Sequence, residues 1–181
     1  PYGSSFASMD IHTSQRVQDE IWARAVHETL YHWDSSANKM VLELAKSVST
    51  SADGLTHTFK LRDDAFFHNG RKMTADDIIW TFTRLMDGSK GYPGARNVRI
   101  IKGATEVEKG QAKEISGLKK VDDFTLEMTT TEKVDPGYYF WGATTAIYPA
   151  DEAQKPEFAT KPIVWSKTAH EVPDDFTTLN R

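Results

Sequence analysis

Cysteine is absent from the 181-residue chain, which excludes disulfide bonds, cysteine-ligated zinc and thiol catalysis. The sequence also lacks a run of 18 apolar residues, so no membrane-spanning helix is predicted. Residues 1–5 carry neither a basic start nor an apolar stretch, so no signal peptide is expected there. Basic residues are outnumbered, 22 against 26 acidic ones, and the net charge of −4 argues against a nucleic-acid partner.

The composition that remains is that of a globular protein. Hydrophobic residues make up 39% of the chain and charged residues 27%. These proportions are ordinary for a folded domain in water, and the length suits one domain or two small ones. A chain of this size can bury a substantial core.

Two β-hairpins give the clearest structural signals. The first is predicted to join residues 47–51 to residues 55–62 through Asp53-Gly54, because Asp-Gly readily adopts the positive φ of a tight turn. Alternation in its second strand places four side chains on one face: Leu55, His57, Phe59 and Leu61. The second hairpin is predicted for residues 117–130 around Asp122-Asp123, with Phe124, Leu126 and Met128 facing inward.

Helices are predicted between the hairpins and on either side of them. Thr74 and Asp77 form a capping box, and the helix that they open should end near Gly88 as its C′ residue. Ser14 is a candidate N-cap for a helix over residues 15–32, whose apolar stripe includes Val17 and Ile21. Shorter helices are predicted for residues 98–109 and for residues 136–141, where Pro136 would occupy N1.

This order of elements predicts an α+β fold of mixed sheet hairpins with packed helices, since regular βα alternation is absent. Residues 166–181 are polar and aperiodic, and order is expected there only if another part of the protein holds them.

A search for catalytic chemistry finds little. The sequence contains no GxSxG, HExxH or P-loop motif. His57 lies on the apolar face of the first hairpin, where a half-buried imidazole with one hydrogen bond is the favoured interpretation. Glu28 and His32 are four residues apart on a predicted helix, but a metal site would need further ligands from distant segments. No metal and no cofactor are therefore predicted.

Three acidic pairs and a group of loop aromatics are further candidate site residues. Asp63-Asp64, Asp76-Asp77 and Asp122-Asp123 fall in turns or in a helix first turn, where aspartate is favoured for capping, so a structural role is predicted. Tyrosine, phenylalanine and tryptophan gather in or next to loops, where they could line a ligand site or pack the loops down. The sequence leaves these two alternatives open.

The central stretch resembles the family-5 extracellular solute-binding proteins, the peptide/nickel/opine class. The resemblance rests on ordered segments within residues 44–83: Leu44-Ala45-Lys46-Ser47, Asp53-Gly54-Leu55-Thr56, Thr58-Phe59-Lys60-Leu61-Arg62, His68-Asn69-Gly70 and Thr74-Ala75-Asp76-Asp77. Residues 7–12 resemble the family's SLDPH segment, with Ile11 where proline is usual, and residues 28–31 resemble its ExLY segment. The second hairpin also matches, so the resemblance covers roughly residues 5–150.

The resemblance implies part of a periplasmic-binding-protein type II fold. Residues 1–13 would be the edge of the N-terminal lobe, residues 14–150 its small extra domain, and residues 151–181 a poorly defined segment. Family members are longer and have two lobes, so the chain is expected to be a fragment. An interaction module, such as a receptor or adhesin fragment on the same scaffold, is the alternative.

The implied function is the substrate-binding component of an ABC transporter, which captures a peptide-like or similar small solute and is not an enzyme. The implied partners are that solute and a membrane permease, and the implied location is periplasmic or extracytoplasmic with a membrane anchor. A monomer is expected. By resemblance, the ligand-binding residues would be Phe6, Tyr92, Trp141 and Thr144. Because the second lobe is missing, weak or no solute binding is expected of the isolated chain.

Overall fold

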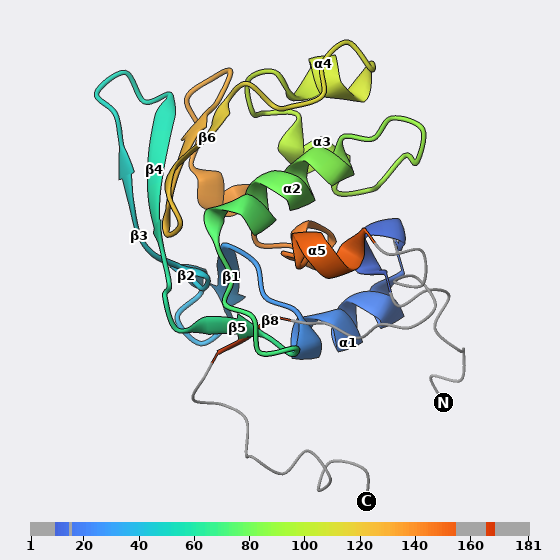
Figure 1. Ribbon diagram of the computed structural model, residues 1–181. Coiled ribbons are helices and arrows are strands. Elements are labelled where there is room, and N and C mark those ends of the chain that lie inside the picture. The colour runs from blue at the N-terminus through green and yellow to red at the C-terminus, as the bar shows by residue number, and fades with distance from the viewer. Residues whose placement is uncertain (1–9, 15, 155–165, 169–181) are drawn as a thin grey trace, which may run out of the picture.

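The computed structural model describes residues 10–14, 16–154 and 166–168 (Figure 1). Its helical elements are η1 (Ile11–Thr13), α1 (Val17–Val26), α2 (Ala75–Leu85), α3 (Ala95–Val98), α4 (Ala104–Glu108), η2 (Pro136–Tyr138), η3 (Ala143–Thr145) and α5 (Ala150–Ala153). Its strands are β1 (Tyr31–Asp34), β2 (Lys39–Leu42), β3 (Ala45–Thr50), β4 (Thr56–Leu61), β5 (Ala65–Phe67), β6 (Leu118–Asp122), β7 (Thr125–Thr129) and β8 (Ser166–Thr168). The predicted α+β class is confirmed.

The central sheet is antiparallel, with strand order β3-β4-β7-β6, and α2 lies beside it (Figure 1). The main core forms between them. Its fully buried members include Phe59, Leu126 and Met128 from the sheet and Ile78, Phe82 and Leu85 from α2. Two smaller sheets, β1-β2 and β5-β8, complete the described strands.

Both predicted hairpins are confirmed. β3 pairs with β4, and Gly54 in their turn has a φ of +76°. Phe59, Leu61 and His57 are buried on the same face, as their alternation requires. His57 is fully buried rather than half-buried, and its Nδ1 makes the one expected hydrogen bond, 3.0 Å from Thr50 Oγ1. β6 and β7 form the second hairpin.

The capping box of α2 is confirmed, but the predicted helix end is not. Thr74 N donates to Asp77 Oδ2 at 2.9 Å, and the reciprocal bond to the Thr74 side chain is present. The helix stops at Leu85, with Met86 as C-cap, and Gly88 is not left-handed. Gly88 instead allows close approach, because a Cβ there would lie 2.2 Å from the Glu108 carbonyl oxygen.

The predicted helix over residues 15–32 is wrong in length and in its buried face. α1 ends at Val26 because residues 31–34 form β1, whose register with β2 pairs Tyr31 with Leu42. Val17 and Ile21 are 70% and 62% exposed, so the apolar stripe does not face the core. Ser14 is not the N-cap: Arg16 holds that position, while the Ser14 hydroxyl donates to the Asp19 carboxylate.

The two shorter predicted helices are also corrected. Residues 98–109 do not form one helix, because Gly103 adopts a φ of +83° and separates α3 from α4. The helix at Pro136 is a single 3₁₀ turn that ends at Tyr138. Asp135 caps it, since its Oδ1 accepts a 2.9 Å hydrogen bond from Gly137 N.

Candidate ligand-binding site

A pocket of about 210 Å³ opens where five segments meet. Arg24 comes from α1, His27 and Thr29 from the stretch after it, His32 and Trp33 from β1, Glu43 from the link between β2 and β3, and Trp141 and Ala143 from the region of η3. Two indoles, a guanidinium and a carboxyl group therefore face one small volume. Five of the eight lining side chains are polar or charged, so the pocket is more polar than the mostly apolar sites that are typical of drug-sized ligands.

Glu43 is held in place through one of its two oxygens. Its Oε2 accepts hydrogen bonds from Thr29 N at 2.7 Å and from Thr29 Oγ1 at 3.2 Å. His32 Nδ1 lies 3.8 Å from Oε1, which is beyond hydrogen-bond range. Burial raises the pKa of Glu43, although the Thr29 hydrogen bond opposes this. The side chain remains 22% exposed.

Arg24 lies across the pocket wall formed by Trp141. The carbon of its guanidinium is 5.0 Å from the centre of an indole ring of Trp141, which is a cation–π contact. Within the described part of the chain, Arg24 forms no salt bridge. Its N–H donors therefore remain available at the pocket.

A second polar cluster ties η1 to Arg84 of α2. The Arg84 guanidinium bonds both the Asp10 carboxylate and His12 Nδ1, and the other ring nitrogen of His12 lies 2.8 Å from Ala146 O. The rings of His12 and Tyr148 stack with centroids 4.1 Å apart. Tyr148 Oη accepts a 2.8 Å bond from Ile11 N. These contacts are satisfied within the protein, so we assign the cluster a structural role.

The predicted site residues do not gather in one place. Trp141 lines the pocket. Tyr92 is buried under Arg84, whose guanidinium carbon lies 4.6 Å from its ring centre. Thr144 is buried in η3, and its carbonyl oxygen packs against Gly94. Phe6 lies outside the described residues.

The sequence did not predict seven of the eight pocket residues as ligand contacts, and the four that matter most for the site are Arg24, His32, Trp33 and Glu43. The sequence suggests His32 only as a possible metal ligand that shares a helix face with Glu28. In the structure His32 lies on β1. The other three sit in ordinary surface patterns. No sequence signal could have found them, because the pocket depends on how α1, β1 and η3 come together.

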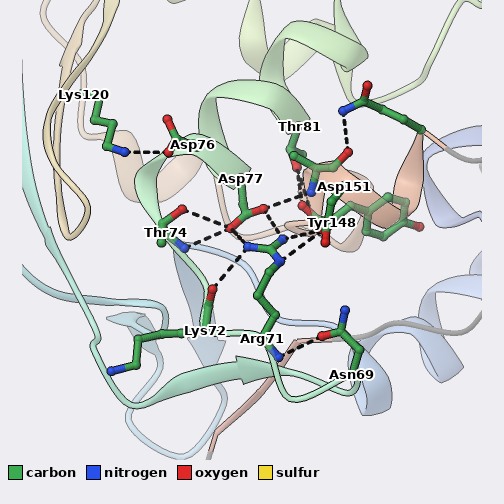
Figure 2. A network of polar contacts seen from close by, with 12 residues as sticks. Asn69, Arg71, Lys72, Thr74, Asp76, Asp77, Thr81, Lys120, Tyr148 and Asp151 are labelled. Carbon is green, nitrogen blue, oxygen red and sulfur yellow. Dashed lines mark hydrogen bonds and ion pairs between the residues drawn. The ribbon is translucent and has the colours of Figure 1, made fainter.

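The three acidic pairs have the structural roles predicted for them. Figure 2 shows Arg71 bound to Asp77 through both carboxylate oxygens, at 2.6 and 3.0 Å, and to Asp151 on α5. Lys120 bridges Asp76 and Asp123 at 2.6 and 2.7 Å. The Asp63 and Asp64 carboxylates pair with Lys46 and Arg62.

The described residues show neither a cluster of metal ligands nor a membrane-spanning helix. No group of three or more histidine, aspartate or glutamate side chains is placed to hold a metal ion in that part of the chain. None of its helices combines the length and apolarity needed to cross a bilayer.

Comparison with known proteins identifies the family. The model of the bacterial extracellular solute-binding proteins, family 5, matches residues 39–166. The dipeptide-binding protein of Lactococcus lactis is 32% identical over 128 residues, which are 70% of this chain and 23% of that protein. The periplasmic oligopeptide-binding protein OppA of Escherichia coli is 29% identical over 184 residues, which cover 98% of this chain and 32% of that protein.

Solved structures agree on the fold. Haemophilus influenzae OppA in complex with RPPGFSPFR superposes with a TM-score of 0.78 at 25% identity, over 87% of this chain and 32% of that one. The chain thus spans between about a quarter and a third of the length of these relatives. With its family match over residues 39–166 and its shared fold, the chain belongs to the family-5 bacterial extracellular solute-binding proteins.

Proposed function

We propose that the chain is part of the substrate-binding component of an ABC transporter and captures a peptide-like solute. The observation that carries the proposal is the family match over residues 39–166. The relatives named above are dipeptide- and oligopeptide-binding proteins, which favours a peptide-like solute over other classes. Capture would proceed by closure of two lobes over the solute, without the making or breaking of a covalent bond.

The remaining attributes follow from this proposal. A capture component works outside the cytoplasm, in the periplasm or anchored to the outer face of a membrane, and it delivers its solute to a membrane permease. It is not an enzyme. We propose that it acts as a monomer. The net charge of −4 supports the absence of a nucleic-acid partner.

The division of the chain into regions also remains a proposal. Residues 14–150 would form the small extra domain of the N-terminal lobe, with residues 1–13 at the lobe edge and residues 151–181 as a separate segment. The main core draws its buried side chains from residues 30–147, which suits this division, whereas a smaller core cluster joins Ile11 to Ala143 and Tyr148 across the boundary at residue 13.

Trp141 is the proposed solute-contacting residue that the geometry supports best. It lines the pocket, whereas Tyr92 and Thr144 are buried against Arg84 and Gly94. Solute contact by Tyr92 and Thr144 would therefore require the exposure of side chains that are now packed. Their ligand-binding role, and that of Phe6, stays a prediction.

Calorimetric titration of the protein expressed from its complete gene tests the capture function. The titrants are di-, tri- and pentapeptides, with free sugars as the comparison class. We expect saturable one-to-one binding of at least one peptide length and none of the sugars. Absence of peptide binding, together with unchanged peptide uptake in cells that lack the gene, would overturn the proposal.

A further inference from the structure

The pocket carries opposite charges on different walls. Glu43 presents a carboxylate oxygen that forms no hydrogen bond with another described residue, and Arg24 presents a guanidinium without an ion-pair partner in the same part of the chain. Both side chains line the same pocket, yet they do not form an ion pair with each other, for which N and O must lie within 4.0 Å. A ligand group of each sign can therefore be placed between them.

The rest of the pocket favours an ammonium group near Glu43. Trp33 and Trp141 supply aromatic faces, which attract cations through the ring quadrupole. His32 Nδ1 is buried and makes no hydrogen bond within the described residues, so a ligand could form a hydrogen bond with it. Arg24 occupies one face of Trp141 and can bind a carboxylate through its planar fork of donors.

Size limits the ligand. The volume of about 210 Å³ lies below the roughly 300 Å³ at which pockets for drug-sized ligands begin. A single amino acid, or the end of a very short peptide, is of suitable size, whereas an extended peptide would have to lie mostly outside.

We propose that this pocket binds a small zwitterion of the α-amino acid type, with its ammonium group at Glu43 and its carboxylate at Arg24. The proposal uses the capture function only in the assumption that Trp141 contacts a ligand. It goes beyond that function because it names Glu43 and Arg24 as further ligand contacts and a small zwitterion as the ligand. Binding is weak, since a small ligand buries little surface.

Nuclear magnetic resonance of the 181-residue chain tests the proposal directly. L-Leucine is titrated against ¹⁵N-labelled protein, and the indole N–H signals of its five tryptophans are followed. We expect saturable shifts of the Trp33 and Trp141 signals and little change at Trp80. Isopentylamine, which lacks the carboxylate, and 4-methylpentanoate, which lacks the ammonium group, should each bind at least tenfold more weakly.

Charge-removing variants separate the two ends of the ligand. Glu43→Gln should weaken leucine binding about 10- to 100-fold, as expected for loss of a hydrogen bond to a charged group, and should leave the binding of 4-methylpentanoate unchanged. Arg24→Gln should weaken leucine and spare isopentylamine. Matched controls are Glu127→Gln on β7 and Arg96→Gln on α3, which lie outside the pocket and should bind leucine like the parent chain.

Several outcomes would overturn the proposal. These are the absence of saturable indole shifts at high leucine concentration, equal binding of the two half-ligands and leucine, or equal loss in the pocket and control variants.

A dipeptide and a tetrapeptide titrated in parallel distinguish a free amino acid from a peptide end. If the complete protein binds peptides but the pocket variants bind leucine normally, the pocket assignment fails and the capture function stands. If leucine binds as proposed but the complete protein binds no peptide, the pocket assignment stands and the capture function fails.

Discussion

Arg71 and Asp77 form a two-pronged ion pair that joins the strand region to the start of α2. Both guanidinium Nη atoms bond the Asp77 carboxylate, which is only 1% exposed (Figure 2). The same carboxylate accepts bonds from Thr74 N and from Ala150 N at the start of α5. Asp77 therefore ties three segments together, and its charge is neutralised chiefly by Arg71.

Replacing Arg71 by methionine should lower the free energy of unfolding by about 2–4 kcal/mol. A buried carboxylate that loses its cation typically costs 3–5 kcal/mol, and here two backbone N–H groups remain to offset part of the loss. Urea unfolding monitored by circular dichroism measures the change. The control is Glu108→Gln, which breaks the more exposed pair with Arg99 and should change stability far less. Equal effects of the two variants would contradict the role given to Arg71.

His12 and His27 make the fold sensitive to acid. Burial, together with the neighbouring Arg84 guanidinium, lowers the pKa of His12 from 6.5 to about 4. Burial and the proximity of His12 lower the pKa of His27 to about 3. The contacts agree with a neutral His12, because one ring nitrogen faces the Arg84 donor and must accept while the other faces Ala146 O and must donate.

The sign of the pH dependence follows from these depressed pKa values. Below about pH 6.5 the His12 side chain is protonated in the unfolded chain but stays neutral in the folded chain. The free energy of unfolding therefore decreases as the pH is lowered from 6.5 to the folded pKa near 4. His12 alone should contribute a loss on the order of 3 kcal/mol across this window. Unfolding free energies measured from pH 7 to pH 4 check this.

Substitution isolates the histidine contribution from that of other titrating groups. His12→Gln should be less stable than the parent chain at pH 7 but should show a shallower fall in stability between pH 6.5 and 4. Gln111→Ala is the control, since this exposed side chain has no titratable group and should leave the slope as it is. An unchanged slope in the His12 variant would show that its protonation does not govern acid stability.

Gly94 allows the chain before α3 to pack directly on η3. A Cβ at this position would lie 2.2 Å from the Thr144 carbonyl oxygen and 3.1 Å from Leu85 Cδ2. Gly94→Ala should therefore destabilise the protein by about 1–3 kcal/mol through backbone displacement. Gly142→Ala is the matched control: its nearest neighbour would be 3.8 Å away, and its φ of −79° suits alanine. Thermal unfolding should separate the two variants, and similar midpoints would contradict the packing argument.

What could be predicted from the sequence was local. The capping box at Thr74 and Asp77 and the turn at Gly54 are encoded within a few residues, and both were found where expected. β1 was missed because its conformation depends on pairing Tyr31 with Leu42 across the chain, while residues 15–32 offered a plausible helical period. That pairing, and not helix propensity, decides where α1 ends.

The candidate site was harder to predict for the same reason. Trp141 was predicted from the family resemblance and lines the pocket, but its neighbours Arg24 and Glu43 come from stretches more than one hundred residues and nearly one hundred residues away. No local spacing links them. Tyr92 and Thr144 carried the right chemistry for a ligand site, yet the structure packs them against Arg84 and Gly94.

The ionised carboxylate of Glu43 should lower the stability of the folded chain near neutral pH. Burial raises its pKa above the ordinary value of 4.5, so the folded chain holds its proton more tightly than the unfolded chain does. The stability that this gives is present below about pH 4.5 and is lost as the pH rises through the folded pKa. Glu43→Gln removes the charge while an amide oxygen can still accept from Thr29 N. The variant should therefore gain stability relative to the parent chain as the pH rises from 4.5 to 7.

Urea midpoints measured at pH 4.5, 5.5 and 7 test this trend, with Gln111→Ala, at an exposed site without a titratable group, as the control that should track the parent chain. A gain in stability alongside a loss of leucine binding would separate the two roles of Glu43, because an unfolded variant would lose leucine binding without gaining stability. If Glu43→Gln instead loses stability as the pH rises, then Arg24 and His32 stabilise the charged carboxylate more than burial destabilises it. The pocket would then be an internal charge network with no need of a ligand to complete it.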